Sequence, residues 1–393
     1  MAVSARVLES MKSSSWVRAM FETGIRLKQE HGPEKVCDFS LGNPDLDPPG
    51  EFHRVIGELL SDAAGGHGYM PNGGYPEVRA AVAEYISDEY GTALSGEHVV
   101  MSCGAGGALN VILKSILNPG DTVLASTPCF MEYRAYAANH GGALKLVNGA
   151  DDFNLDIGAL ERAFDGSTAA VIINSPNNPS GRIYPKETIR SLGVMLTDQS
   201  KKAGRSIYLV SDEPYRHIVY DGAEVPSIFS YYRNSVIANS YSKSLSIPGE
   251  RIGWIAVHPE ADEVGTFVDA LILCTRILGF VNAPAIMQRV IGRLAGQRVD
   301  ISPYVRRRDM LCKSLSDMGY ELIRPEGTFY LFPRAPGGDD MAFVDALRQE
   351  LILTVPGSGF GTPGHFRIAF CVDETVIERS LPGFEKVIRS FRT

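Results

Sequence analysis

Seven short apolar runs, separated by segments with helical spacing, dominate the chain between about residues 98 and 258. In order they read HVVMSC, TVLAST, ALKLV, AAVIIN, IYLVSD, VIANS and IGWIAV, and most end in small or polar residues. Continuous apolar runs that alternate with helices are typical of parallel strands covered on both faces. The pattern predicts an α/β fold whose large domain holds a seven-stranded, mostly parallel sheet between helices.

The pattern changes after about residue 284, where the regular alternation ends. Residues 290–319 read as a helix, TFYLFPRA and HFRIAFCV read as strands, and residues 374–391 read as a final helix. This mixture predicts a smaller α+β domain that the N-terminal segment joins. The expected divisions are an N-terminal segment at 1–45, a large domain at 46–284 and a small C-terminal domain at 285–393.

Composition and charge narrow the class of protein. The net charge of −8 argues against a nucleic-acid-binding surface, which needs a basic stripe. The six cysteines form no C-x-x-C pair and fit free thiols in a reducing compartment. The chain shows no apolar run long enough to span a membrane and no signal peptide pattern in its first twenty residues. We therefore expect a cytoplasmic protein without a nucleic-acid or membrane partner. Histidine spacing predicts no metal site.

Candidate chemistry follows the predicted strands, because ligands bind beyond the carboxyl ends of parallel strands. Gly104, Ala105 and Gly106 open a helix after the first run, and free N–H groups there suit a phosphate. A plain tight turn also explains them, and these residues taken alone favour that interpretation. Phe130 follows the second run and could stack on a flat ring or pack in the core.

Two further strand ends carry polar groups. The prolines of NSPNNPSG hold Asn178 in a rigid loop, although a turn without further role has the same pattern. Asp212 ends the run IYLVSD, with Tyr215 three residues later. A buried carboxylate needs a cationic or hydrogen-bonding partner. A helix cap or a structural ion pair would also account for Asp212.

Cationic side chains complete the set. In SYSKSLSIPGERIGW, Lys243 lies between small hydroxyl residues that include Ser240, and Arg251 has the planar fork that suits phosphate. Arg367 interrupts the apolar run HFRIAF and needs an anion, either a ligand carboxylate or a structural partner. Together these groups describe one ligand, a flat ring with a phosphate, a basic nitrogen and an electrophile for an amine. Pyridoxal 5'-phosphate has all of these.

From about Leu41 to Phe370 the sequence resembles the fold-type I, pyridoxal-phosphate-dependent aminotransferases of class I/II. The motifs that carry the resemblance are GYMPNGGYPEVRAAVAEY, GAGGAL, NSPNNPSG, SDEPY, SYSKSLSIPGERIGW, PEGTFYLF and FRIAF, in the order of the family. The resemblance implies transfer of an amino group from an L-amino acid to a 2-oxo acid such as 2-oxoglutarate, by a ping-pong mechanism. It also implies a homodimer with shared active sites.

The resemblance also implies roles for individual residues. Lys243 would form the Schiff base and shuttle the proton, Asp212 would hold the ring nitrogen, and Arg367 would bind the substrate α-carboxylate. The other implied positions are Gly42 and Asn178 at the substrate, Asn178 and Tyr215 at the phenolic oxygen, Phe130 on the ring, Gly104, Ala105, Gly106, Ser240 and Arg251 at the phosphate, and Tyr69 at the phosphate of the other subunit. The stretch GAGG departs from the family, because many relatives have a polar residue second after the Gly-Ala.

Substrate and reaction remain open at this point. Arg276 is the candidate for a second carboxylate clamp, but no motif places it, so a small neutral donor such as alanine is favoured over aspartate. The nearest alternative is a β-lyase or synthase on the same fold. A cofactor-sensing transcription regulator would need an added basic domain, for which the chain has little room. A NAD-binding Rossmann protein would need G-x-G-x-x-G after the first strand.

Overall fold

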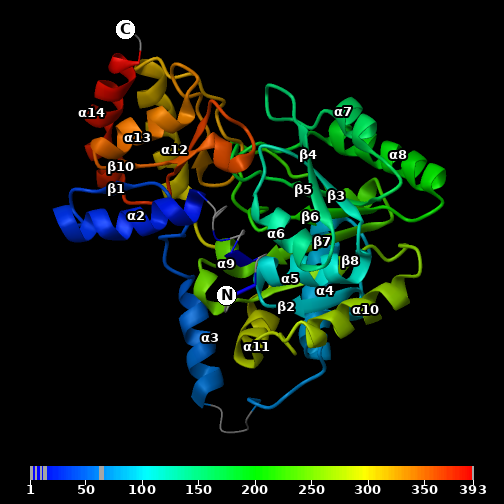
Figure 1. Cartoon of the computed structure of the whole chain (residues 1–393). Coiled ribbons are helices and arrows are strands. Elements are labelled where there is room, and N and C mark those ends of the chain that lie inside the picture. Colours follow the sequence, from blue (N-terminus) through cyan, green and yellow to red (C-terminus); the bar gives the residue numbers. More distant parts are fainter. Residues whose placement is uncertain (1–2, 5–6, 9–10, 12–15, 62–65, 392–393) are drawn as a thin grey trace.

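The computed structural model describes residues 3–4, 7–8, 11, 16–61 and 66–391 of the 393-residue chain. Figure 1 shows a large body built on a central sheet, beside a smaller body that contains the C-terminal helix. No helix in the described part of the chain is long and apolar enough to cross a membrane.

The central sheet has seven strands in the order β2-β8-β7-β6-β5-β3-β4. Each of the seven predicted apolar runs supplies one strand, which confirms the predicted fold class. Strand β8 runs antiparallel to β2 and β7, and the other neighbours are parallel. The strands are β2 (Val99–Ser102), β3 (Thr122–Thr127), β4 (Ala143–Asn148), β5 (Thr168–Asn174), β6 (Tyr208–Asp212), β7 (Ser235–Ser240) and β8 (Gly253–Val257).

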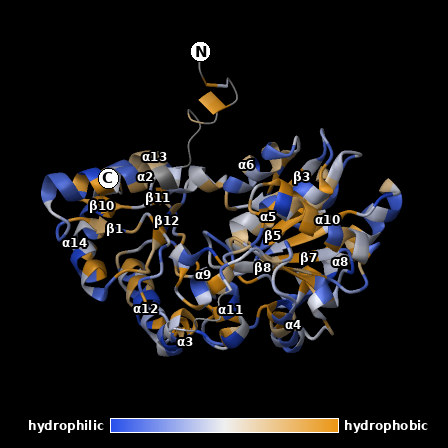
Figure 2. Cartoon of the chain, turned by 90° about the horizontal axis from the view of Figure 1, so that it is seen from below, coloured by the Kyte–Doolittle hydropathy of each residue, from blue (hydrophilic) through white to orange (hydrophobic). Residues whose placement is uncertain are grey.

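Both faces of this sheet are buried, which explains why its strands read as unbroken apolar runs. Along β5, Val171 and Ile173 belong to one core, whereas Ala170 and Ile172 belong to the core on the opposite face. Figure 2 shows this apolar sheet between helices of mixed polarity. Helices α3 (Gly50–Ser61), α4 (Pro76–Tyr90), α7 (Ile157–Ala163), α8 (Lys186–Ala203) and α11 (Ala285–Leu294) cover the first core, and α5 (Gly104–Ile116), α6 (Glu132–Asn139) and α10 (Val264–Ile277) cover the second.

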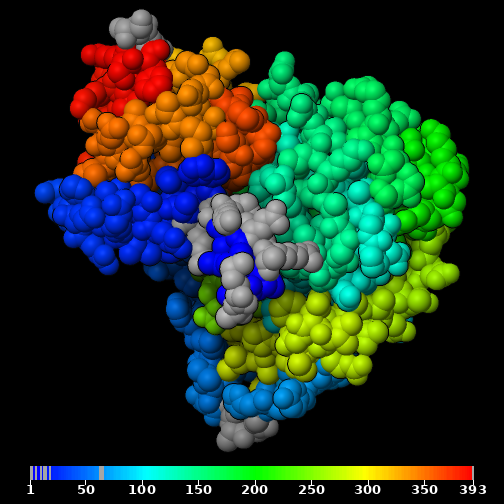
Figure 3. All heavy atoms as spheres, in the orientation of Figure 1, coloured from blue at the N-terminus to red at the C-terminus, as the bar shows by residue number. Residues whose placement is uncertain are grey.

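The smaller body combines the two ends of the described chain. Strand β1 pairs in parallel with β10, and β11, β12 and β9 form an antiparallel sheet. Cys37 and Phe39 share a core with Phe343 and Phe384, and Figure 3 shows the blue N-terminal region against the orange and red C-terminal region. Its elements are α2 (Trp16–His31), β1 (Cys37–Asp38), α12 (Ser302–Asp317), β9 (Tyr330–Leu331), α13 (Asp340–Gln349), β10 (Ile352–Leu353), β11 (Val355–Pro356), β12 (Phe366–Ala369) and α14 (Glu374–Ser390).

The helix expected over residues 290–319 is two helices. Helix α11 ends at Leu294, and α12 begins at Ser302 with Pro303 in its first turn. Gly296 and Pro303 explain the interruption, since glycine weakens a helix interior and proline is tolerated in the first turn. Helix α11 packs against α3 and α4. The domain boundary at residue 285 stays a prediction.

Candidate active site

One cavity of about 300 Å³ lies where the large and small bodies meet. It forms at the carboxyl ends of β5, β6 and β7, and the smaller body contributes Tyr330 and Arg367 to its wall. Eleven of the predicted site residues line it: Gly42, Ala105, Gly106, Phe130, Asn178, Asp212, Tyr215, Ser240, Lys243, Arg251 and Arg367. Residues up to 325 positions apart in the sequence, from Gly42 to Arg367, thus share one wall.

Strand register explains how the polar groups converge. Asp212 is the last residue of β6 and lies opposite Asn174, the last residue of β5, in a parallel ladder. The next strand, β7, ends at Ser240, and the short helix α9 (Tyr241–Ser244) begins directly after it and carries Lys243. Because these strands are parallel neighbours, their ends meet at one edge of the sheet.

Asp212 is a buried carboxylate with one oxygen in use and one without a partner. The Tyr133 hydroxyl donates to Oδ2 at 2.7 Å, and Oδ1 accepts no hydrogen bond from any described residue. Burial raises the pKa of Asp212 to about 7, although the Tyr133 hydrogen bond lowers it and the charge of Glu213 raises it further. A buried acceptor without a donor is costly, so the second oxygen suits a cationic N–H donor.

Lys243 carries a half-buried amine close to the N-terminal segment of the small body. Its Nζ donates a 2.8 Å hydrogen bond to the carbonyl of Gly42. Burial lowers the pKa of Lys243 to about 8. An amine with such a pKa is partly neutral near physiological pH and can act as nucleophile or base. Gly42 must be glycine here, because a Cβ would lie 1.8 Å from the Tyr330 hydroxyl.

Arg367 is 2% exposed and forms no ion pair with an acidic side chain in the described part of the chain. Its guanidinium donates to Asn178 Oδ1 at 3.0 Å and to the carbonyl of Ser40 at 2.6 Å, and its Nε has no partner among the described residues. The ring of Tyr330 lies 4.5 Å from the guanidinium carbon. These neutral contacts hold the fork in place and leave its charge for an anion.

The start of α5 and Arg251 form the opposite end of the cavity. Gly104 begins α5 with a φ of 70°, and a Cβ on it would lie 2.6 Å from a nitrogen of Arg251. Ala105 and Gly106 follow at the cavity wall with the helix N-terminus. Free N–H groups and a guanidinium at one point make an anion-binding site.

Three predicted residues are not part of the lining of this cavity. Gly104 is buried beside Arg251 at the start of α5, and the other two lie on the surface. Tyr69 is 92% exposed, and Arg276, near the end of α10, is also exposed. Their segments touch, because Asn72 Nδ2 donates to the carbonyl of Val281 at 2.6 Å. The thiol of Cys103, just before α5, contacts the carbonyl of Asn282 at 3.8 Å. The loops that follow the two exposed residues therefore contact each other and the residue before α5. The roles of Tyr69 and Arg276 stay predictions.

Sequence reasoning missed several residues of the site. Tyr133 and Tyr136 lie on α6, Asn174 ends β5, and Tyr330 donates or accepts a 2.9 Å hydrogen bond with the Tyr215 hydroxyl. The weak signal for the two tyrosines was their spacing of three residues from each other, which places both on one face of a helix shortly after Phe130. Tyr330 lies in the motif PEGTFYLF, which was recognised without assigning that residue a role.

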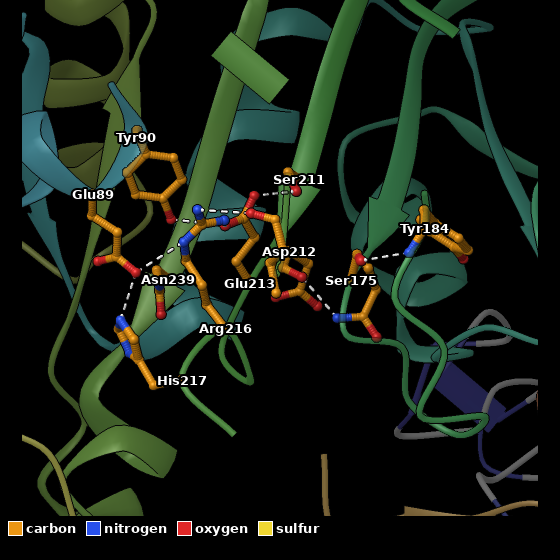
Figure 4. A network of polar contacts seen from close by, with 12 residues as sticks. Glu89, Tyr90, Ser175, Tyr184, Ser211, Asp212, Glu213, Arg216, His217 and Asn239 are labelled. Carbon is orange, nitrogen blue, oxygen red and sulfur yellow. Dashed lines mark hydrogen bonds and ion pairs between the residues drawn. The ribbon is translucent and has the colours of Figure 1, made fainter. Parts of the chain in front are cut away.

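A buried polar network lies behind Asp212, as Figure 4 shows. Glu213 accepts hydrogen bonds from Tyr90 at 2.7 Å and from Arg216 at 2.9 Å, and Arg216 also pairs with Glu89 at 3.0 Å. The carboxylates of Asp212 and Glu213 therefore differ: both oxygens of Glu213 accept hydrogen bonds, whereas Asp212 lines the cavity with one oxygen that has no partner among the described residues. The network fixes the segment that carries Asp212 and Tyr215.

Comparison with known proteins decides the family. The model of the class I and II aminotransferases matches residues 34–382. The chain belongs to this family. It is 28% identical to the aspartate/prephenate aminotransferase of Thermus thermophilus over 398 residues, covering 98% of each protein.

Solved structures of aminotransferases have the same fold. An amino transferase from Eubacterium rectale is 38% identical, with a TM-score of 0.95 and full coverage of both chains. The aspartate aminotransferase of Thermus thermophilus with maleate is 26% identical, with a TM-score of 0.87, and the match covers 98% of this chain and 100% of that one. The predicted family, fold and enzyme class are thus confirmed.

Aminotransferases of this family use pyridoxal phosphate, and the cavity fits that group. The unpartnered Asp212 Oδ1 suits a protonated ring nitrogen, and the Lys243 amine suits an aldehyde. The glycine at position 104 and the start of α5 leave room for a phosphate beside Arg251. The residues present thus suit the ring nitrogen, the aldehyde and the phosphate of the cofactor.

Proposed function

We propose that this aminotransferase moves the amino group of L-aspartate to 2-oxoglutarate by a ping-pong mechanism. The observation that carries the proposal is the convergence of three groups in one cavity. They are a half-buried amine of lowered pKa and, counting partners among the described residues only, a carboxylate with an unpartnered oxygen and an arginine without an acidic partner. These are Lys243, Asp212 and Arg367. Transamination needs a group for each of three tasks: proton transfer, electron withdrawal and substrate binding.

Pyridoxal phosphate supplies an aldehyde that condenses with amines and a protonated ring that takes up the electrons left when a Cα–H bond breaks. Lys243 has two tasks in this scheme: it holds the aldehyde between turnovers and, once displaced, removes the substrate Cα proton. Its pKa of about 8 leaves enough neutral amine near pH 7–8 for this work.

Asp212 keeps the ring nitrogen protonated in the proposal. Its Oδ1 would accept the N–H of the bound ring, while the 2.7 Å hydrogen bond from Tyr133 holds the other oxygen. A cation at the ring nitrogen favours the ionised carboxylate, and this reverses the effect of burial on its pKa. Asn178 and Tyr215, which line the same wall, donate toward the phenolic oxygen of the ring.

Arg367 binds the substrate α-carboxylate in this proposal. Asn178 Oδ1 and the carbonyl of Ser40 orient its guanidinium, and the Tyr330 ring covers one face. A planar fork held in this way favours bidentate binding of a carboxylate. Gly42 lines the same cavity, and its backbone is the further contact that we propose for the substrate.

Aspartate and 2-oxoglutarate each carry a second carboxylate, which needs a cationic partner. The cationic residues that line the cavity in the described chain are Lys243, Arg251 and Arg367, and each already has another role in the proposal. A further cation has to come from outside. We assign it to Arg276 of the partner subunit, because Arg276 is exposed and its segment lies at the phosphate end of the cavity. The relatives named aspartate aminotransferase support the same choice.

This assignment requires a homodimer with shared sites. Tyr69 is 92% exposed in a loop that contacts the segment after Arg276, so both side chains are available to a second copy. Exposed apolar residues Leu273 and Ile277 lie beside Arg276 on α10. A two-fold interface would cover them and bring Tyr69 to the partner's phosphate.

The test is a screen of amino donors against 2-oxo acceptors with purified holoenzyme. Aspartate with 2-oxoglutarate should give glutamate, and initial rates should show parallel double-reciprocal lines. Alanine is the second candidate, favoured by the single arginine available for substrate in the chain's own cavity. Pyruvate and ammonia formed from one substrate without any acceptor would indicate a lyase and contradict the proposal.

A further inference from the structure

The first turn of α5 carries no polar side chain. It reads Gly104, Ala105, Gly106 and Gly107, so α5 itself offers the cavity backbone N–H groups and no side-chain donor. The other groups already assigned to this end are Arg251, Ser240 and, in the proposed dimer, Tyr69 of the partner subunit. A dianionic phosphate has more acceptor sites than these donors fill, so a neighbouring element can add one.

Helix α6 is that neighbouring element. It packs along α5, and Asn139 Nδ2 donates to Asn110 Oδ1 at 3.2 Å between the two helices. Tyr133 and Tyr136 are three residues apart and therefore share one face of α6. The Tyr133 hydroxyl reaches Asp212 at 2.7 Å, and Tyr136 lines the same cavity nearer to α5.

The Tyr136 hydroxyl lies directly over the start of α5. A Cβ built on Gly106 would be 3.2 Å from it. Tyr136 is half-buried, and its hydroxyl forms no hydrogen bond with any residue in the part of the chain that the structure describes. Burial raises the pKa of Tyr136 to about 12, although the charge of Arg251 lowers it, so the hydroxyl keeps its proton and can donate.

We propose that Tyr136 is a cofactor-binding residue whose hydroxyl donates a hydrogen bond to the cofactor phosphate. It supplies, from α6, the side-chain donor that the Gly-Ala-Gly-Gly start of α5 lacks. The position favours the phosphate over the substrate, because the hydroxyl lies at Gly106 on α5, whereas Arg367 lies on the strand β12 of the smaller body. This inference rests on the proposed placement of the phosphate at α5.

Removal of one hydroxyl tests the contact. In Tyr136→Phe, the dissociation constant of pyridoxal phosphate from the apoenzyme should rise roughly 10- to 100-fold, the range for a lost hydrogen bond to a charged group. The affinity of the apoenzyme for inorganic phosphate, measured by its competition with reconstitution by pyridoxal phosphate, should fall by a similar factor. Pyridoxal, which has the ring and aldehyde but no phosphate, should bind as it does to the wild type. Tyr208→Phe, at the other end of β6, is the matched control and should change none of these constants.

A second substitution separates a lost donor from a disturbed fold. Gly106 lies in the helical backbone of α5, and in Tyr136→Phe a serine side chain at position 106 has the space that the hydroxyl leaves. Adding Gly106→Ser to Tyr136→Phe should therefore restore much of the affinity for pyridoxal phosphate and inorganic phosphate. Equal weakening of pyridoxal and pyridoxal phosphate, or no change in either, would overturn the proposal. Covalent attachment at Lys243 should survive in Tyr136→Phe at saturating cofactor, so failure of this inference leaves the proposed function testable.

Discussion

Tyr133 donates a 2.7 Å hydrogen bond to Oδ2 of Asp212 and leaves Oδ1 as the carboxylate oxygen without a partner in the described chain. This one-sided arrangement orients the carboxylate. The ring of Tyr133 also meets Phe130 edge to face, with 5.6 Å between centroids. A single side chain, that of Tyr133, thus links the proposed ring-stacking residue Phe130 to the proposed ring-nitrogen partner Asp212.

Asp212→Asn should separate catalysis from cofactor retention. The amide can still accept from Tyr133, but it cannot hold a proton on the ring nitrogen. We expect kcat to fall by roughly 100-fold or more, which corresponds to about 3 kcal/mol or more. Cofactor occupancy at saturating concentration should stay close to the wild type, since the phosphate contacts remain. Near-normal kcat would show that the ring is activated in another way.

Asp212→Asn should lower activity, but it should raise the stability of the apoprotein at neutral and higher pH. Burial raises the folded-state pKa of Asp212 from its usual 3.8 to about 7. Between these values the folded state binds more protons than the unfolded state, so ionisation destabilises the fold as pH rises toward 7, by roughly 4 kcal/mol at most. Apo Asp212→Asn should therefore melt above the wild-type apoprotein at pH 8 and show little difference at pH 4. An equal rise in melting temperature at pH 4 and pH 8 would show that ionisation of Asp212 does not cause the stabilisation.

Arg367→Gln should impair every amino donor, because all of them carry the α-carboxylate. Loss of one partner of a buried, charged contact costs about 2–5 kcal/mol, so kcat/KM should fall by roughly 30-fold or more for aspartate and alanine alike. The measurement is kcat/KM for each donor at fixed acceptor concentration. A fall confined to dicarboxylate substrates would move Arg367 to the side-chain carboxylate instead.

Arg276→Ala should impair only the dicarboxylate substrates, whereas Arg367→Gln should impair every amino donor. Aspartate and 2-oxoglutarate should lose affinity, whereas half-reactions with alanine, followed by the spectrum of the bound cofactor, should be unchanged. Arg293→Ala, a change of another exposed arginine that pairs with Glu58, is a suitable control. Unchanged kinetics for both dicarboxylates would remove Arg276 from the site.

Mixing of subunits tests the shared site. Tyr69→Ala and Lys243→Ala should each be nearly inactive. After exchange in equal amounts, about half of the dimers are mixed, and each mixed dimer has one site with both defects and one site with neither. About a quarter of all sites should then be intact. If mixed dimers form and no activity returns, Tyr69 acts in the active site of its own subunit.

The sequence predicted the large body well because its signals are local. Each apolar run became a strand, and the residues directly after those runs, such as Asp212 and Ser240, became cavity residues. Contacts that depend on packing between elements distant in the sequence left no local signal and could not be predicted from it. The hydrogen bond from Tyr133 to Asp212 spans 79 positions, and the Tyr215–Tyr330 contact spans 115. The break between α11 and α12 was missed because the apolar spacing continues on both sides of it.

The central claim is that Lys243 carries the cofactor, and chemical labelling tests it most directly. Borohydride reduction of the holoenzyme, followed by proteolysis and mass spectrometry, should place one pyridoxyl group per chain on the peptide that contains Lys243. The position of this amine in the cavity wall and its lowered pKa account for its selection over the exposed lysines. A pyridoxyl group on any other lysine, with Lys243 unmodified, would contradict the account.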